Sequence, residues 1–395
     1  MPPALSTEQQ EAVLREFREQ LVQEDLIHDG DSIGTDDRTL TRFLRARHYN
    51  LKQAKAMWKA CQHWRGTVEG VGIDELYRNI DPWDYPERDH VFNCWPLWFH
   101  KKGRPLNIHF FGKINMPKLY KHISPERHWQ TVLVNCESLT REVLPAATHA
   151  AGRPIDGTFV IVDLKGFSLS QFWQMKNLAR SSFQVSQDYF PETMAQLAIV
   201  NAPSSFTTIW SFIKPWLAKE TVAKVDILGS DYQSVLLDLI EAENLPSSLG
   251  GTCNCEGGCE KSNAGPWREG RQERREAWLR GEGEVAVQVN KDVLAAGARG
   301  TAEEDAEERK DKDSHEQALE EKASRGGLGG ILSSVARKAD SPGPPTPPLD
   351  AASEISGLAL SPTNSEAGEG VRPDAMVAAT KESEVRAVRE SAPVA

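Results

Sequence analysis

Residues 158–166, with the sequence TFVIVDLKG, decide the fold class of this chain. The run is apolar at successive rather than alternate positions, which is typical of a strand buried on both faces. Further strands of this kind occupy residues 195–203 and 224–229, and helical patterns occupy residues 168–189, 204–217 and 232–245. Strands that alternate with helices predict an α/β domain with a mostly parallel sheet covered by helices.

The segment before this domain changes its pattern twice. Helical patterns cover residues 7–22, 36–50 and 51–66, with Ser6 as the cap of the first and Gly66 as the end of the third. Residues 91–111 then resemble two strands joined by KKGRP, and residues 125–143 return to a helical period. We therefore expect an N-terminal helical bundle before the sheet begins.

Aromatic residues indicate where folding ends. The chain has 30 Phe, Trp and Tyr residues, and all except Trp278 precede residue 271. From Arg271 onward there are 17 Lys+Arg against 24 Asp+Glu, which is −7 of the chain's net charge of −11. Acidic sequence of this kind is typical of disorder. The predicted parts are a helical lobe, an α/β domain, a Cys/Gly-rich closing segment and an acidic disordered tail, at residues 1–66, 67–252, 253–270 and 271–395.

Several classes of protein are disfavoured by what the sequence lacks. No apolar run approaches the roughly 18 residues of a transmembrane helix, and the start lacks the pattern of a signal peptide. We expect a cytosolic protein whose six cysteines are reduced. The acidic balance argues against nucleic acid as the main partner. There is no Rossmann or P-loop glycine motif and no hydrolase signature.

Two opposite charges stand at the amino ends of neighbouring apolar strands. Glu192 shortly precedes one strand and Lys224 opens the next. Nucleotide sites lie at the carboxyl ends of parallel strands, so this position argues against a nucleotide. Arg47 lies seven residues beyond Leu40, on the inward face of the second helical pattern, where an unpaired guanidinium is costly and needs an anion. An arginine that extends into solvent at the helix end is the alternative, and both stay open.

Residues 206–217 carry more apolar side chains than a surface helix needs. The expected stripe is widened by two aromatics, and the whole set is Phe206, Ile209, Trp210, Phe212, Ile213, Trp216 and Leu217. Pro215 falls inside the pattern and should kink the helix. Two interpretations stay open: a fully buried core helix, or a movable lid over a cavity that meets a bilayer with part of its surface.

Two other groups of residues invite a chemical role. Asp163 and Lys165 stand at a strand's carboxyl end, where we favour a turn stabilised by the carboxylate over catalysis. Cys253, Cys255 and Cys259 suggest a metal, but structural zinc uses four ligands and no nearby His or Cys supplies a fourth. We therefore expect neither a metal nor a cofactor, and no enzyme activity.

Motifs in register over residues 36–268 resemble the CRAL-TRIO family, and most closely its phosphatidylinositol-transfer branch. They are TLTRFLRARHYNLKQAKAMWKACQHWR, VDLKG, SQDYFPETM, IVNAPSSFTTIWSFIKPWL, TVAKVDILGSDYQ and ENLPSSLGG. The resemblance implies a helical lobe and an α/β domain whose sheet floors a hydrophobic pocket gated by the helix at residues 206–217. It implies that Arg47, Glu192, Thr221 and Lys224 hold the phosphatidylinositol headgroup. The cysteine cluster and the following GPW also resemble the end of many such proteins.

The sequence departs from this branch around its second ligand, phosphatidylcholine. Positions that usually carry tyrosines and small hydroxyls hold Phe99, Asn107, Cys136 and Val160, and only Thr158 keeps a hydroxyl. Tyrosine faces stabilise a quaternary ammonium, whereas Cys, Asn and Val do not. We predict weak phosphatidylcholine exchange and another lipid or a sterol-like molecule as the second ligand.

The resemblance implies a carrier rather than an enzyme. Enclosing two chains of about 16 carbons is favoured over water by roughly 20 kcal/mol or more, so exchange requires an open pocket against a membrane. We expect transient contact with Golgi or endosomal membranes and a lipid kinase as a possible recipient of phosphatidylinositol. Alternatives are a carrier of a non-phospholipid ligand, or a lipid-sensing scaffold whose tail binds partners, with Ser341, Thr346 and Ser361 as phosphorylation candidates.

Overall fold

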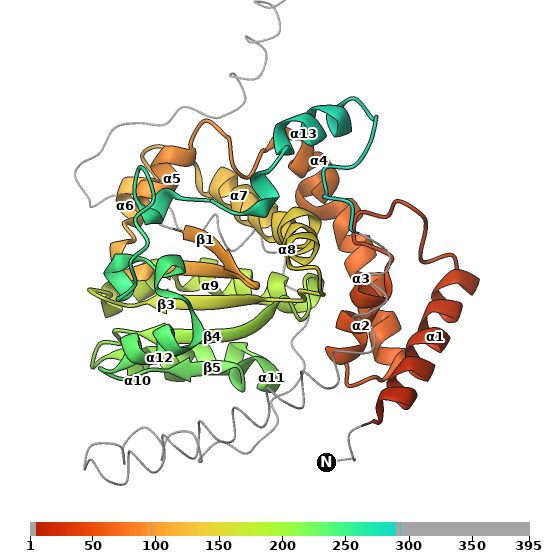
Figure 1. Cartoon of the computed structure of the whole chain (residues 1–395), viewed down its shortest axis with the longest axis horizontal. Coiled ribbons are helices and arrows are strands. Elements are labelled where there is room, and N and C mark those ends of the chain that lie inside the picture. Colours follow the sequence, from red (N-terminus) through yellow and green to blue (C-terminus); the bar gives the residue numbers. More distant parts are fainter. Residues whose placement is uncertain (1–4, 96, 290–292, 294–395) are drawn as a thin grey trace, which may run out of the picture. The chain divides into compact units, whose positions relative to one another are not determined.

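A five-stranded sheet organises the chain, as the computed structural model shows for residues 5–95, 97–289 and 293 (Figure 1). The strands follow one another in the order β1-β2-β3-β4-β5. β1 is antiparallel to β2, and the remaining neighbours are parallel. The strand bounds are Leu97–Lys102, Arg104–Phe110, Thr158–Asp163, Met194–Val200 and Val225–Ile227. The α/β fold with a mostly parallel sheet is therefore confirmed.

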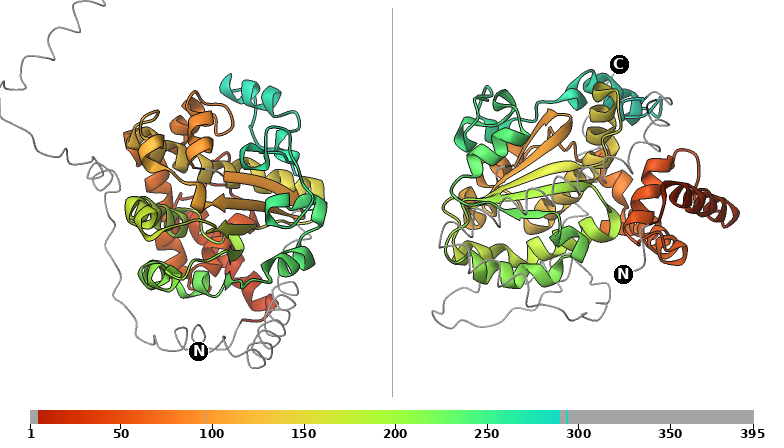
Figure 2. Two further views of the ribbon diagram at one scale, coloured as in Figure 1. Left: turned by 90° about the vertical axis from the view of Figure 1, so that its left-hand side faces the viewer. Right: turned by 60° about the horizontal axis from the view of Figure 1, so that its bottom comes forward.

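Helices cover both faces of this sheet (Figure 2). β3 is buried at all six positions, as its unbroken apolar run predicts. Its residues divide by alternation, so that Val160 and Val162 join the core under α7 and α9, whereas Phe159 and Ile161 join the core under α12. These helices are Pro125–Ser138, Leu169–Tyr189 and Tyr232–Leu239. We call the α7/α9 side the first face and the α12 side the second face.

The N-terminal helices share a core of their own. α1, α2 and α3 span Thr7–Gln23, Asp37–Arg45 and Leu51–Thr67. Ser6 and Gln9 form the predicted capping box of α1, and Asp36 caps α2. Trp58 of α3 is fully buried against Phe17 and Phe43, which come from the other two helices. α3 also packs against α9, so this bundle lies beside the α/β domain.

The remaining helices connect the strands and close the fold. They are α4 (Ile73–Asn79), α5 (Arg88–Cys94), α6 (Met116–Leu119), α8 (Leu144–Ala151), α10 (Phe206–Ile213), α11 (Lys219–Val222) and α13 (Arg271–Leu279). A π-helical segment, Leu139–Val143, joins α7 to α8. None of the helices in the described residues is long and apolar enough to cross a membrane.

Three boundaries differ from the sequence predictions. Residues 91–94 belong to helix α5, so the hairpin comprises only the later part of residues 91–111. Gly66 lies inside α3, which continues to Thr67. Pro215 does not kink a long helix, because α10 ends at Ile213 and the chain continues as a 3-10 turn. That turn accepts proline at its start, where no helical N–H is required.

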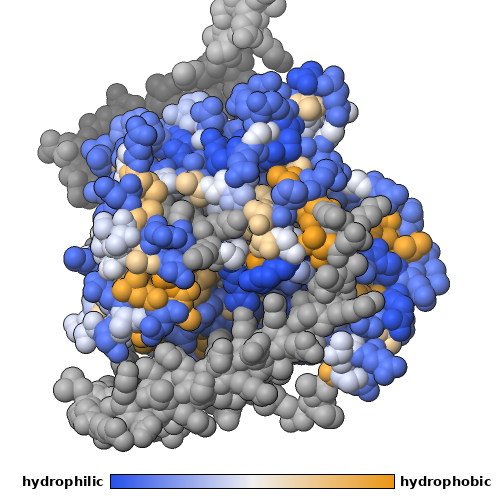
Figure 3. All heavy atoms as spheres, in the orientation of Figure 1, coloured by the Kyte–Doolittle hydropathy of each residue, from blue (hydrophilic) through white to orange (hydrophobic). Residues whose placement is uncertain are grey.

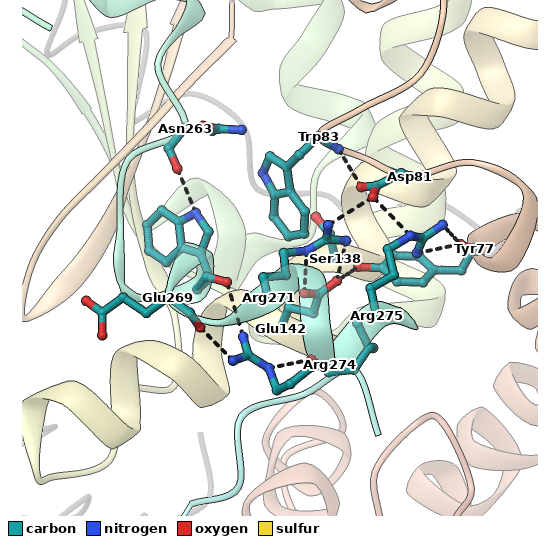
Figure 4. A network of polar contacts seen from close by, with 12 residues as sticks. Tyr77, Asp81, Trp83, Ser138, Glu142, Asn263, Glu269, Arg271, Arg274 and Arg275 are labelled. Carbon is teal, nitrogen blue, oxygen red and sulfur yellow. Dashed lines mark hydrogen bonds and ion pairs between the residues drawn. The ribbon is translucent and has the colours of Figure 1, made fainter. Parts of the chain in front are cut away.

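The predicted start of the disordered tail is also wrong. α13 begins at Arg271, and this residue is buried. Its guanidinium donates to Glu142, with an Nε to Oε2 distance of 2.7 Å, and to Asp81, with an Nη1 to Oδ2 distance of 2.9 Å (Figure 4). Trp83 covers it, with 4.2 Å between the guanidinium carbon and the ring centroid. Ion pairs hold this helix together with its one aromatic residue, Trp278, which packs on the core of the first face and meets Tyr77 edge to face at 6.0 Å. One aromatic residue in an acidic sequence is a weak signal, which is why composition alone did not indicate the helix. Residues 294–395 of the predicted tail lie outside the described residues.

Candidate functional site

Glu192 and Lys224 form an ion pair at the amino-terminal edge of the sheet. The Nζ atom of Lys224 lies 2.7 Å from Oε2 of Glu192 and donates to the carbonyl of Met194 at 3.1 Å. Glu192 precedes β4 and Lys224 precedes β5, which are parallel neighbours. Parallel strands start at the same edge, so residues 32 apart in the chain meet. Each side chain keeps about a quarter of its surface exposed, so a ligand can reach both.

The backbone around the pair is specialised. Glu192 has φ of 58°, in the left-handed region, in the turn between α9 and β4. Non-glycine residues rarely adopt this conformation, and it is found disproportionately at functional positions. Thr221 lies in the short helix α11 and is partly buried. Its carbonyl accepts a hydrogen bond from the backbone N–H of Lys224 at 3.1 Å, so one turn carries both residues.

Arg47 lies in a turn and not, as the sequence predicted, on the inward face of a helix. α2 ends at Arg45, so Arg47 is not on a helical face; it lies in a turn where His48 and Tyr49 have positive φ. Within that turn its Nη1 donates to the carbonyl of Ala46 at 2.8 Å. The arginine of α2 that burial affects is instead Arg42, whose pKa is lowered by desolvation.

The Arg47 turn lies against the elements that carry the other site residues. Nε2 of His48 is 3.1 Å from Oε1 of Glu220, the residue before Thr221. Burial raises the pKa of Asp188, near the end of α9, while the nearby charge of Arg47 opposes that shift. No contact within hydrogen-bond distance joins the Arg47 side chain to the Glu192–Lys224 pair in the described residues. The structure thus joins Glu192 and Lys224 directly and places the Arg47 and Thr221 segments beside elements of the pair.

The predicted gate consists of α10 and a 3-10 turn, Lys214–Trp216. Phe206 and Ile209 are buried, but Phe212 is 43% exposed, so the interpretation as a fully buried core helix is wrong. Trp210 and Ile213 pack partly buried on the core of the first face. Trp216 stacks on Phe172 of α9 at 6.3 Å between ring centroids.

Two exposed apolar areas flank this part of the fold. Phe212 meets Trp173 of α9 edge to face at 5.2 Å, and Trp173 is itself 42% exposed. We call these two side chains the aromatic pair. A second area lies on α12, where Leu237 and Leu239 are exposed, and hydrophobic side chains gather on the surface there (Figure 3). The segment predicted to form a gate is tied to α9 by Gln187, which donates to the carbonyl of Trp216 at 3.0 Å.

Four of the five predicted second-ligand residues have described side chains. Asn107, Thr158 and Val160 belong to the first face of the sheet, and Cys136 belongs to α7, which covers that face. Phe99 is placed opposite Asn107 by the β1–β2 register, but its side chain lies outside the described residues. Oδ1 of Asn107 is buried without a hydrogen-bond partner in the described structure. Thr158 already donates to the carbonyl of Thr193 at 3.3 Å.

Two histidines on this face escaped the sequence analysis. His109 follows Asn107 by two residues and so shares its face, and His128 of α7 lies in an aromatic cluster with Trp95 and Tyr120. Nδ1 of each ring is buried without a hydrogen-bond partner in the described residues. Burial lowers the pKa of both to about 4, so both are neutral at pH 7. The alternation of Asn107 and His109 with apolar residues in β2 is the signal that could have found the first one.

Two other predictions concern the end of β3 and the late cysteines. Oδ1 of Asp163 accepts from the backbone N–H of Lys165 at 2.9 Å and from Asn201 at 2.8 Å. This is the turn-stabilising role expected of it. The three late cysteines are brought together, as described below.

The comparisons with known proteins agree with this architecture. Residues 89–251 match the CRAL/TRIO domain, and residues 13–60 match the CRAL/TRIO N-terminal domain. The chain belongs to the CRAL-TRIO family.

Named relatives cover most of the folded part. The chain is 41% identical over 237 residues to the Sec14 cytosolic factor of Schizosaccharomyces pombe, which spans 59% of this chain and 81% of that protein. It is 38% identical over 271 residues to the SEC14 cytosolic factor of Kluyveromyces lactis, with 66% and 85% covered. It is 34% identical over 260 residues to the phosphatidylinositol/phosphatidylcholine transfer protein SFH4 of Arabidopsis thaliana. This alignment covers 64% of this chain and 41% of that longer protein.

Proposed function

We propose that this chain binds phosphatidylinositol and transfers it between membranes, with the headgroup at the Glu192–Lys224 pair. The observation that carries the proposal is the partly exposed ion pair at the edge of an apolar sheet face. A phosphate oxygen can replace the carboxylate as the acceptor for Lys224, and an inositol hydroxyl can then donate to Glu192. The relative named as a phosphatidylinositol/phosphatidylcholine transfer protein supports this ligand class.

Arg47 and Thr221 complete the proposed headgroup site. A guanidinium carries five N–H donors, and within the described structure Arg47 uses one, toward the carbonyl of Ala46. The remaining donors suit a phosphate. The hydroxyl of Thr221 is one turn of chain from Lys224 and offers a further donor.

Transfer of phosphatidylinositol between vesicles tests this assignment. Lys224→Ala and Glu192→Ala should each reduce the transfer rate by about tenfold or more, because each removes a charge-assisted hydrogen bond to the headgroup. Gln196→Ala is the matched control: Gln196 donates to Asp226 at 2.8 Å and joins the same two strands on the second face. Normal transfer by both site variants would refute the site.

We further propose that phosphatidylcholine is a poor second ligand. A trimethylammonium group has no N–H or O–H, so it cannot donate to Asn107 Oδ1 or pair with the His109 and His128 ring nitrogens. Leaving such atoms unpaired in the interior costs roughly 1–3 kcal/mol each. A lipid or sterol-like molecule with hydroxyl groups fits better. Equal transfer rates for phosphatidylcholine and phosphatidylinositol would contradict this.

A carrier of a non-phospholipid ligand is the alternative favoured by the same unpaired atoms. Mass spectrometry of lipids that copurify with the full chain separates the two. Phosphatidylinositol in the extract supports the proposal, and only a hydroxylated non-phospholipid supports the alternative.

We also propose that the bound phosphatidylinositol is presented to a lipid kinase at Golgi or endosomal membranes. Presentation to a kinase and the choice of membrane both rest on the proposed transfer of phosphatidylinositol. The alternative of a lipid-sensing scaffold concerns the tail, of which residues 294–395 lie outside the described residues. A phosphatidylinositol kinase assayed on vesicles should be stimulated by the full chain and not by Lys224→Ala. Fluorescence microscopy of the tagged chain checks the organelle.

A further inference from the structure

The closing segment brings three thiols to one point. The Sγ atoms of Cys253, Cys255 and Cys259 all lie within 4.8 Å of one another, and those of Cys253 and Cys255 are 3.7 Å apart. All three side chains are partly buried. A tetrahedral zinc ion with Zn–S bonds of about 2.3 Å holds its sulfurs about 3.8 Å apart. The sulfurs of Cys253 and Cys255 already have this spacing, and the sulfur of Cys259 needs a shift of at most about 1 Å to reach it.

The backbone between these cysteines is a built turn. Gly257 and Gly258 have φ of 76° and 94°, in the region that favours glycine. The N–H of Gly258 donates to the carbonyl of Cys255 at 2.9 Å, which reverses the chain. Cys259 therefore returns to the first two cysteines, and its Sγ lies 3.5 Å from the carbonyl of Cys253. The spacing C-x-C-x-x-x-C is thus folded so that its sulfurs converge.

The cluster rests on the second face of the sheet, away from the Glu192–Lys224 pair. The three cysteines pack against its apolar core. The N–H of Cys253 donates to the carbonyl of Leu245 at 3.0 Å, and the N–H of Ser247 donates to the carbonyl of Cys253 at 3.1 Å. An ion bound here would tie the end of the α/β domain into a rigid loop.

We propose that Cys253, Cys255 and Cys259 bind one thiophilic d10 metal ion, Zn²⁺ or Cu⁺, through three thiolates. Three thiol protons are released on binding, and with zinc the fourth position is taken by water. The sequence predicted no metal because structural zinc uses four protein ligands, but three converging thiolates can hold an ion whose fourth ligand is water. A disulfide is the other chemistry open to paired thiols. A disulfide needs its two sulfurs about 2.05 Å apart, whereas those of Cys253 and Cys255 are 3.7 Å apart. A disulfide between these two cysteines would also close a ring that contains only one intervening residue.

Cobalt titration of the full chain tests the site. The protein is first stripped of metal and fully reduced, and Co²⁺ serves as the optical probe. We expect one Co²⁺ per chain, intense tetrahedral visible bands and thiolate charge-transfer absorption, all abolished by equimolar Zn²⁺. A parallel titration with Cu⁺ against a chromogenic chelator shows which ion is held more tightly. Weak six-coordinate bands would overturn the proposal.

Variants and thiol protection locate the ion. Cys259→Ser should weaken Co²⁺ binding by about 100-fold or more, since it removes a direct ligand. Cys94→Ala, a buried thiol elsewhere, should leave it unchanged. In the unmodified chain, Zn²⁺ should protect three thiols from alkylation, assigned by peptide mass spectrometry, so the test does not depend on a variant that folds. Protection of other cysteines, or alkylation of all three cluster thiols in the presence of Zn²⁺, would refute the site.

Discussion

The guanidinium of Arg65 forms a two-pronged ion pair with Glu137. Its Nη1 and Nη2 atoms lie 2.9 Å and 2.7 Å from the two carboxylate oxygens, and both side chains are buried. Arg65 belongs to α3 and Glu137 to α7, so this pair fastens the N-terminal bundle to the helix that covers the first face. Arg141 donates to the same carboxylate at 2.8 Å. The bundle is therefore held by paired charge as well as by apolar packing.

Removing one member of this pair should be costly. We expect Arg65→Met to lower the free energy of unfolding by roughly 3–5 kcal/mol, because it leaves a buried carboxylate with less compensation. Chemical denaturation followed by circular dichroism measures the change. Lys59→Met is the control, since it breaks a solvent-exposed pair with Glu24 and should cost about 1 kcal/mol or less. If both substitutions lowered the free energy of unfolding equally, the buried pair would stabilise the fold no more than the exposed one does.

The buried histidines predict an acid-sensitive fold. In the folded chain the pKa of His109 and of His128 is about 4, against 6.5 when unfolded. The unfolded chain therefore binds more protons between these values, so stability is present above pH 6.5 and is lost as the pH falls toward 4. From pH 7 to pH 5 we expect a loss of about 2 kcal/mol per histidine.

Denaturation at pH 7 and pH 5 measures this dependence, with His128→Gln as the test variant. It should reduce the loss by about half. His149→Gln is the control, because this histidine lies on α8, outside the buried cluster. Glu137 does not confuse the result. Burial raises its pKa, but Arg65 and Arg141 outweigh burial and lower it to about 2, so its contribution is lost only below pH 4.5. An unchanged pH slope in His128→Gln would contradict the assignment.

Sequence patterns predicted the sheet well because its strands are buried on both faces. The meeting of Glu192 and Lys224 also followed, since parallel neighbours begin at one edge. Arg47 was harder, because its predicted helical face assumed that α2 continued to residue 47. The end of this helix depends on a turn in which His48 and Tyr49 both have positive φ, a conformation that few non-glycine residues adopt and that a hydrophobic pattern does not indicate.

The exposed aromatic pair should contact the membrane during transfer. Phe212→Ser should reduce vesicle binding and the transfer rate severalfold, because it removes apolar area from the contact surface. Its effect on stability should be small, since this side chain is 43% exposed. Vesicle sedimentation and transfer assays check both. Val22→Ser is the control, an exposed apolar residue of α1. If Leu239→Ser lowers binding and Phe212→Ser does not, α12 is the membrane-facing surface instead.

The charged network around Arg271 changes what a truncation of the tail should do. Glu142 is 1% exposed, accepts from Arg271 through both carboxylate oxygens and also accepts from the hydroxyl of Tyr77. Asp81 receives a second cation, with Nε of Arg275 at 2.9 Å. Composition alone places residues 271–279 with the tail, but the network makes them part of the folded domain.

Two truncations separate these roles. Removing residues 271–395 should lower the free energy of unfolding by roughly 3–5 kcal/mol, because it leaves the Glu142 carboxylate buried without its arginine. Removing residues 290–395 retains α13 and its ion pairs with Glu142 and Asp81, and should leave stability within about 0.5 kcal/mol of the full chain. Denaturation curves of the two truncations and of Arg271→Met decide the matter. Arg271→Met should reproduce most of the loss, because it removes the same cation while keeping the helix. If the chain without residues 271–395 is as stable as the full chain, then the buried network around Arg271 does not stabilise the domain. The cooperatively folded part would then end before residue 271.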